Sequence, residues 1–210
     1  MKLPMNLFRL LVSTLVLSTV FLLASLAQQP SGSTTPKPTP APKEYPKERI
    51  AGLVHDWTRA RDYTKEYLDT MPEDGMNFKP TPEMRTFAEQ MLHLAIVNYA
   101  YGAGATGQPY PLAGSAKNVP LTGPTIEKWM EERKTKAALT KAVIESYDFI
   151  INGLQALNEA KLDEPKMFAG VRWPVHAYLQ LGFEHQTHQR ALTAVYLRLK
   201  GVKPPAGKFF

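Results

Sequence analysis

Apolar residues recur at every third or fourth position over four stretches of the chain, which is the spacing of amphipathic α-helices. These stretches cover about residues 47–70, 81–101, 125–160 and 174–200. The second is expected to begin with Thr81 as its N-cap and Pro82 in the first helical position. No strand-like alternation of useful length appears after residue 27. Four long amphipathic helices without strands predict an all-α protein, a four-helix bundle.

The first 27 residues depart from this pattern. Lys2 and Arg9 flank the start of a nearly uniform apolar run, and the segment Ser25-Leu26-Ala27 has small residues at the two positions that a signal peptidase reads. We therefore predict a cleaved secretory signal peptide over residues 1–27 and a periplasmic or secreted mature protein. The alternative is an uncleaved helix that anchors the chain in the inner membrane, because the run approaches the ~20 residues that span a bilayer.

Residues 28–46 are rich in Pro, Ser and Thr and have almost nothing to bury, so they are expected to form an extended linker. The folded domain is then expected over residues 47–205, followed by a short tail over 206–210. This arrangement separates the exported end of the chain from its globular part.

The chain has no cysteine. Export therefore brings no disulfides, and a lipoprotein anchor, thiolate metal ligands and a thiol nucleophile are all excluded. Lys2 and Arg9 supply two of the formal net charge of +6, and the first 27 residues contain no acid, so the predicted mature chain carries +4. Its basic residues are scattered and alternate in sign with acidic ones, which argues against a nucleic-acid partner and against membrane binding after signal cleavage.

Two of the five histidines lie three residues apart on the last predicted helix. At about 100° per residue, Tyr178 and Tyr196 fall within about 40° of His185, His188 within about 60°, and Gln189 about 40° to the other side. Both histidines are therefore expected to face the interior. The two tyrosines are candidates to line a pocket there, although aromatic residues at this spacing also pack as ordinary core.

On the second predicted helix, His93 shares its face with apolar residues and with Glu89 and Gln90 one turn earlier. Imidazoles that converge inside a bundle can satisfy their ring nitrogens by sharing a divalent ion. The alternative is a set of hydrogen-bonded core histidines, because the spacing of one histidine pair does not by itself identify a metal site. His55 and His176 are expected at the surface or behind the site.

Two segments carry a resemblance to a known family. Residues 62–95, DYTKEYLDTMPEDGMNFKPTPEMRTFAEQMLHLA, and residues 195–205, VYLRLKGVKPP, resemble the DinB-like (YfiT-like) family, and the likeness extends over about residues 48–205. It implies an up-down-down-up four-helix bundle that holds one divalent ion, zinc or nickel, on three histidines. One of these comes from the second helix and two come from the last. Some relatives are metal-dependent thiol transferases that use low-molecular-weight thiols.

Carried over residue by residue, the resemblance makes His93 and His185 metal ligands. Relatives usually place the third ligand four residues after the second, and that position is Gln189 in this chain, while His188 lies one residue early. Either His188 or the carbonyl oxygen of Gln189 would complete the site, or the site is degenerate. Glu89 is the candidate to orient a ligand or to act as a base, and its alternative is a solvated carboxylate at the end of the bundle.

The sequence thus predicts an exported DinB-like protein that binds a divalent metal and acts as a metal-dependent thiol transferase or hydrolase of unknown substrate. The alternative is a non-catalytic bundle with a degenerate metal site that serves as a binding or structural protein. A small molecule such as a low-molecular-weight thiol is the expected partner. Relatives often dimerise, so a homodimer is a further expectation from the resemblance.

Overall fold

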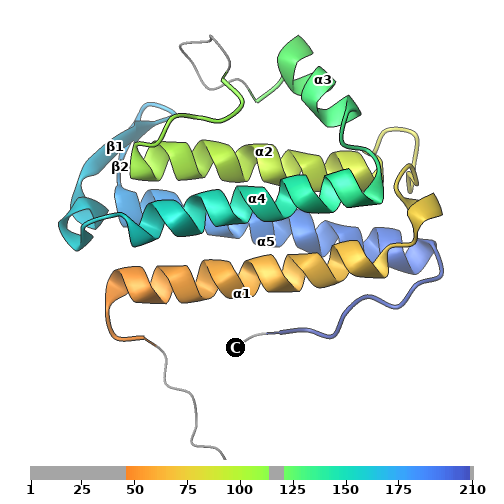
Figure 1. Ribbon diagram of the computed structural model, residues 1–210, viewed down its shortest axis with the longest axis horizontal. Helices are drawn as coiled ribbons and strands as arrows, with labels where there is room; N and C mark the ends of the chain where they lie inside the picture. Colours follow the sequence, from red (N-terminus) through yellow and green to blue (C-terminus); the bar gives the residue numbers. More distant parts are fainter. Residues whose placement is uncertain (1–45, 114–120, 209–210) are drawn as a thin grey trace, which may run out of the picture. The chain divides into compact units, whose positions relative to one another are not determined.

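The computed structural model describes residues 46–113 and 121–208. Four long helices run side by side within this part of the chain (Figure 1): α1 (Arg49–Thr70), α2 (Phe87–Thr106), α4 (Lys136–Gln155) and α5 (Val175–Leu199). Helices α1 and α5 run in one direction and α2 and α4 in the other. Helix α1 packs against α4 and α5, and α2 likewise packs against α4 and α5. The predicted all-α, up-down-down-up four-helix bundle is therefore confirmed.

The predicted signal peptide and nearly all of the predicted linker lie outside the described residues. Within the described residues, no helix is long and apolar enough to cross a bilayer. The C-terminal segment after α5 runs back along the bundle as far as Lys208 (Figure 1).

Helix α2 begins later than the sequence suggested. Thr81 starts only a turn, in which its carbonyl oxygen accepts from the N–H of Met84 at 3.2 Å. The N-cap is Thr86, whose side chain accepts from the N–H of Glu89, while the Glu89 carboxylate accepts from the N–H of Thr86. This reciprocal capping box satisfies two N–H groups that would otherwise lack partners, and it fixes the start of α2 at Phe87.

The third predicted helix, over about 125–160, is two helices in the structure. A short α3 (Pro124–Glu131) is separated from α4 by a break in which Thr135 adopts an extended backbone, with φ −72° and ψ 148°. The Thr135 side chain accepts from the N–H of Ala138 and so begins a new helix. Periodicity alone missed this break, because the apolar stripe continues across it.

A small hairpin fills the connection before α5, where the sequence predicted no strand. Strands β1 (Pro165–Phe168) and β2 (Val171–Pro174) pair antiparallel, with Phe168 opposite Val171. The two residues between them, Ala169 and Gly170, have φ of 50° and 76°, as two-residue hairpin turns require. Neither strand has a clear buried face, so no alternation of apolar and polar residues marked them.

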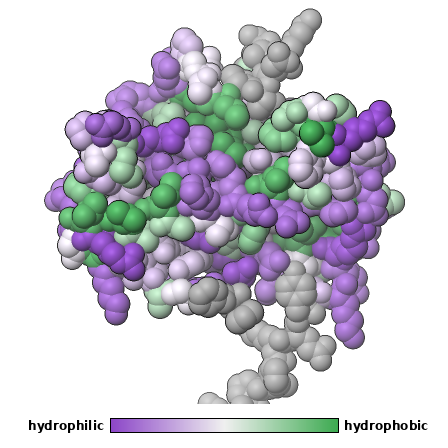
Figure 2. All heavy atoms as spheres, turned by 180° about the vertical axis from the view of Figure 1, so that it is seen from behind, coloured by the Kyte–Doolittle hydropathy of each residue, from purple (hydrophilic) through white to green (hydrophobic). Residues whose placement is uncertain are grey.

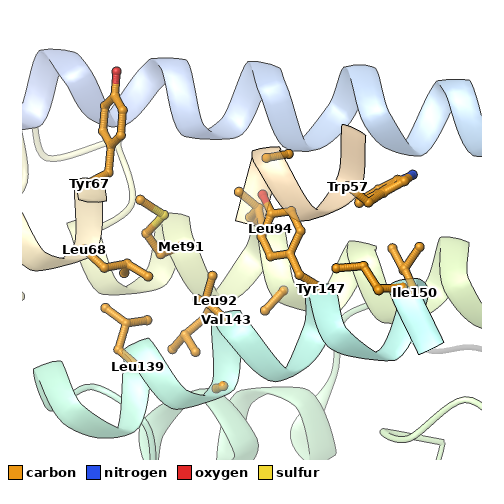
Figure 3. Close-up of a cluster of buried hydrophobic side chains, with 14 of the residues drawn as sticks. Trp57, Tyr67, Leu68, Met91, Leu92, Leu94, Leu139, Val143, Tyr147 and Ile150 are labelled. Atoms are coloured by element: carbon orange, nitrogen blue, oxygen red, sulfur yellow. The ribbon is translucent and has the colours of Figure 1, made fainter. Parts of the chain in front are cut away.

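The hydrophobic core lies where α1, α2 and α4 face one another and α5 closes the bundle. In Figure 3 the labelled core side chains from these first three helices point toward a shared interior. Its largest fully buried members include Trp57, Tyr147, Tyr196 and Phe87. Figure 2 shows a largely hydrophilic surface on the face opposite to Figure 1, with hydrophobic residues in separate patches. The core therefore accounts for most of the apolar periodicity in the sequence.

Candidate metal centre

The histidines of α2 and α5 meet at the interface between these two helices. The ring centroids of His93 and His185 are 5.3 Å apart, with the ring planes inclined at 66°. Both side chains are partly buried. The helices are adjacent and antiparallel, so residues that are 92 positions apart in the sequence converge on one point in the interior. The two ligands predicted with most support from the family resemblance are thus brought together.

Gln189 joins this pair, and His188 does not. The amide nitrogen of Gln189 donates to Nε2 of His185 at 3.2 Å, and the Gln189 side chain is buried. His188 is exposed on the same helix, so the expectation that it faces the interior is wrong. An i, i+4 residue stays closer to the His185 face than an i, i+3 residue, and in α5 the inward-facing arc includes the first and excludes the second.

A second glutamine, Gln90 of α2, completes the arrangement. Its amide nitrogen donates to the carbonyl oxygen of Gln189, and this hydrogen bond links α2 to α5. Gln90 precedes His93 by three residues, which places both on neighbouring parts of one helix face. Sequence reasoning noted the polar residues near His93 but missed Gln90 as the partner of Gln189. Two inward-facing glutamines on facing helices would have indicated this hydrogen bond. They can be recognised as partners only once α2 and α5 are known to be adjacent.

One ring nitrogen of the pair has no partner. Because Nε2 of His185 accepts from Gln189, the proton of this imidazole lies on Nδ1, which is buried and has no hydrogen-bond partner among the described residues. Leaving a buried donor unpaired costs about 1–3 kcal/mol. A bound ion or ligand that reorganised the Gln189 amide and the imidazole could relieve this cost.

Burial keeps both imidazoles neutral. It lowers the pKa of His93 to about 4, with a smaller contribution from the positive charge of Arg85. It also lowers the pKa of His185 to about 4, and the neighbouring His93, His188 and Arg85 add to the effect. At neutral pH both side chains are therefore neutral imidazoles, which is the form that a metal ion requires, and an ion would take the place of Gln189 at the His185 lone pair.

Glu89 is occupied at the N-terminus of α2. Its carboxylate accepts from the backbone N–H of Thr86 at 2.8 Å and lies 3.6 Å from the ammonium group of Lys134. Burial alone would raise the pKa of Glu89, but the hydrogen bond from Thr86 and the charge of Lys134 outweigh it and lower the pKa. The structure gives this residue a capping role, and a carboxylate with a lowered pKa is a weak base.

Aromatic side chains form a wall beside His185. The ring of Tyr101 lies 6.5 Å from the ring of His185 and 4.9 Å from that of Tyr178. Phe168 of the hairpin packs on both tyrosines, at 5.9 Å from Tyr101 and 5.3 Å from Tyr178. Tyr178 was a sequence candidate to line the site, whereas Tyr101 and Phe168 were not. Tyr101 reaches His185 only through the packing of α2 on α5, and Phe168 is brought there by the hairpin.

The remaining candidates lie elsewhere. Tyr196 donates to the carbonyl oxygen of Arg85 at 2.9 Å and packs in the core near the start of α2. His55 is exposed beside Asp56, and His176 is exposed with its Nδ1 3.2 Å from the carbonyl oxygen of Leu162. Both histidines therefore lie at the surface, as the helical pattern indicated.

Across residues 46–113 and 121–208, no group of three or more His, Asp or Glu side chains is arranged to hold a metal ion. The two imidazoles supply two nitrogen donors. The Gln189 carbonyl oxygen accepts from Gln90 while the amide nitrogen faces His185, so the amide would have to turn over to add an oxygen donor. Imidazole suits zinc and nickel, and a neutral amide oxygen is a weaker third ligand for such ions. The residues present therefore fit a divalent ion bound mainly through two histidines.

The first and last long helices of the bundle are antiparallel to the middle two, and a histidine pair lies between α2 and α5. These features define a helical protein with a candidate metal centre. The sequence profile of the DinB superfamily matches residues 56–192, so the chain belongs to the DinB superfamily. No curated protein matches it.

Two solved structures show the same fold. A DinB-like protein from Bacillus cereus is 18% identical, with a TM-score of 0.60, and the match covers 76% of this chain and 97% of that one. A DinB-like protein from Bacillus subtilis is 21% identical, with a TM-score of 0.52, and the match covers 75% of this chain and 95% of that one. At these identities the likeness concerns the fold.

Proposed function

We propose that the protein binds one divalent metal ion, zinc or nickel, through His93 and His185, with the carbonyl oxygen of Gln189 as the third ligand. The observation that carries the proposal is the meeting of two neutral imidazoles with a buried amide at the α2–α5 interface. Gln90 holds the Gln189 side chain in place from the opposite helix. Partners of this kind behind a metal ligand orient it and strengthen binding.

We further propose that the bound ion serves a transferase or hydrolase reaction on a small molecule, such as a low-molecular-weight thiol. When bound, a divalent ion with an open coordination position supplies a Lewis acid that lowers the pKa of water or of a thiol. The chain's own contribution is to present two lone pairs at neutral pH and to exclude water with Tyr101, Tyr178 and Phe168. The N-terminal apolar run supports placing this activity in the periplasm or outside the cell.

Gln189 favours a second candidate, a bundle that binds a metal weakly or not at all and works through a partner. An amide in place of a third imidazole lowers the affinity expected for zinc or nickel. In this case the hydrogen bonds from Gln90 to Gln189 and on to His185 would serve as a polar link between two helices. The metal content of the purified protein distinguishes these two candidate functions.

The test is elemental analysis of residues 28–210 after zinc or nickel loading, in the wild type and in three variants. We expect about one ion per chain in the wild type, because structural and catalytic sites of this kind bind one ion. His93→Ala and His185→Ala should lose the ion. His188→Ala is the matched control on the same helix and should retain it, because His188 is exposed. A wild type without stoichiometric metal would support the second candidate, and loss of metal in His188→Ala would contradict the proposed ligand set.

A further inference from the structure

A cavity of about 350 Å³ lies on the opposite side of α5 from the histidine pair. Its lining comes from α1, α5 and the C-terminal segment, and includes Arg59, Tyr63, Tyr67, Phe183, Arg190 and Lys208. At about 100° per residue, Phe183 and Arg190 lie about 140–160° around α5 from His185. The cavity therefore shares no lining residue with the candidate metal centre.

Arg190 is the distinctive residue of this cavity. Its side chain is almost completely buried, with 7% of the residue exposed. Its Nη1 donates to the carbonyl oxygen of Gln186 at 2.7 Å and to the hydroxyl of Thr64 at 3.4 Å, and its guanidinium carbon lies 4.8 Å from the centre of the Tyr63 ring. Within the described chain all these partners are neutral. A buried cation is normally paired with an anion, because desolvating an unpaired charge is unfavourable.

The acceptors around Arg190 are already shared. The carbonyl oxygen of Gln186 also accepts from the hydroxyl of Tyr147 at 2.8 Å, and the Thr64 hydroxyl lies 2.8 Å from the same tyrosine oxygen. This network fixes the position of Arg190 without neutralising it. The guanidinium is thus held in place with part of its donor capacity uncommitted.

Further donors line the entrance. Arg59 lies at the rim, where its Nη1 donates to the backbone carbonyl oxygen of Lys208 at 3.4 Å and its Nη2 is 3.7 Å from Asp56. Lys208 pairs with Glu66. The hydroxyls of Tyr63 and Tyr67 are 3.4 Å apart, and burial, with the nearby Tyr63, raises the pKa of Tyr67 to about 12, so this phenol keeps its proton. The two rim charges are balanced by carboxylates, and Arg190 is not.

We propose that this cavity binds a small organic anion, in which a carboxylate or phosphate group pairs with Arg190 and a compact apolar body packs against Tyr63 and Phe183. The planar guanidinium matches both kinds of anion through paired hydrogen bonds. The volume lies at the lower end of the range for small-molecule sites, so it admits a ligand about the size of one aromatic ring with its charged group. Arg59 stands at the entrance, where its guanidinium offers further N–H donors to the anion.

The experiment is isothermal titration calorimetry of residues 28–210 with benzoate and phenyl phosphate, which share an apolar ring and differ in the anion. Benzamide is the neutral control for benzoate. EDTA is present throughout, and the His93→Ala variant is titrated in parallel. We expect saturable binding of at least one of the two anions, no binding of benzamide, and the same affinity in His93→Ala. The site then stands apart from the proposed metal centre, and failure of one proposal leaves the other intact.

Substitutions of single arginines test where the anion binds. Arg190→Met keeps the length of the side chain without its charge, and Arg59→Met does the same at the rim. We expect affinity to fall at least tenfold in Arg190→Met and severalfold in Arg59→Met. Arg172→Met, at an exposed position of the hairpin, should bind as the wild type does. The anion should also raise the melting temperature of the wild type and leave that of Arg190→Met unchanged, because a ligand stabilises only a fold that binds it.

Three results would overturn the proposal. The first is that neither anion binds the wild type at millimolar concentration. The second is that benzamide binds as tightly as benzoate. The third is that a folded Arg190→Met binds the anions with wild-type affinity or, if Arg190→Met does not fold, that Arg59→Met at the rim binds them with wild-type affinity.

Discussion

The neutral state of His93 and His185 gives the metal-free protein a specific pH dependence. Burial lowers the pKa of each to about 4, whereas an unfolded chain protonates histidine near pH 6.5. Between these values the unfolded state binds more protons than the folded state, so stability falls as the pH falls. The contribution of the pair is complete above pH 6.5 and lost as the pH approaches 4.

We expect this loss to be on the order of 2 kcal/mol for the pair, since both rings are partly solvated and screened. The measurement is urea unfolding in EDTA at pH 7 and pH 4.5, for the wild type and for a His93→Gln/His185→Gln variant. Carboxylates titrate alike in both proteins, so the difference in pH dependence reports the histidines. Equal pH dependence in the two proteins would show that the imidazoles are not kept neutral by burial.

At the residue scale the sequence predicted two site residues well and a third only as an alternative. His93 and His185 follow from helical periodicity and the family resemblance, and Gln189 follows from counting one turn onward. His188 was misplaced because a 60° offset lies at the limit of the buried arc, and the width of that arc depends on how closely α2 approaches α5. The sequence placed Gln90 on the His93 face, but its hydrogen bond to Gln189 and the position of Tyr101 were missed, because both depend on contacts between helices that periodicity does not specify.

Among the elements, α2 depends on its capping box. Replacing an N-cap threonine with alanine costs about 1 kcal/mol, so Thr86→Ala should lower the free energy of unfolding by about that amount. Thr81→Ala is the control, since Thr81 is exposed outside the helix and should change stability by less than about 0.5 kcal/mol. Chemical denaturation of the two variants is the measurement. A larger loss for Thr81→Ala would contradict the assigned start of α2.

Contact between α2 and α5 requires glycine at position 182. A Cβ atom built there would lie 2.8 Å from Cγ and 3.0 Å from Cβ of Tyr101, and the latter atom has little freedom to move. Gly182→Ala should therefore lower stability by about 1–2 kcal/mol, even though alanine gains about 1 kcal/mol over glycine in a helix.

The same substitution in a Tyr101→Ala background tests this cause. Without the ring, the 2.8 Å contact with Cγ disappears and only the 3.0 Å contact with Cβ remains, so Gly182→Ala should cost clearly less stability than it does in the wild type. Unfolding free energies of the wild type, the two single variants and the double variant complete the cycle. If Gly182→Ala lowered stability by the same amount in both backgrounds, contact with the Tyr101 ring would not be the cause of the loss.

The sequence predicted the long helices wherever a long apolar stripe exists. The break between α3 and α4 was not, because Thr135 interrupts the backbone without interrupting the stripe. The hairpin was not predictable either, because its strands are four residues long and exposed on both sides.

For the whole molecule, we expect the domain to fold without its N-terminal region. The buried hydrophobic residues of the described chain run from Trp57 to Leu197, and the four long helices supply nearly all of them. A chain of residues 47–210 should unfold in one cooperative transition, with a melting temperature within a few degrees of that of residues 28–210. Calorimetry of both chains is the measurement. A markedly lower melting temperature for the shorter chain would show that residues 28–46 contribute to the fold.

The bundle and its helix directions were predictable from sequence because the family resemblance supplied a topology that periodicity alone leaves open. The cavity beside Arg190 was not, because it depends on three segments that meet only in the folded chain. Helix α5 thus has two different polar faces, one toward α2 and one toward α1. The sequence pattern indicated functional candidates only on the face that carries His185.

The most direct test of the central claim is X-ray absorption at the zinc edge of the zinc-loaded wild type, which counts imidazole ligands. We expect two imidazoles, with oxygen ligands filling the remaining positions, and the same spectrum for His188→Ala. A third imidazole that disappears in His188→Ala would contradict this expectation, because His188 would then have to turn inward and displace Gln189 from the site.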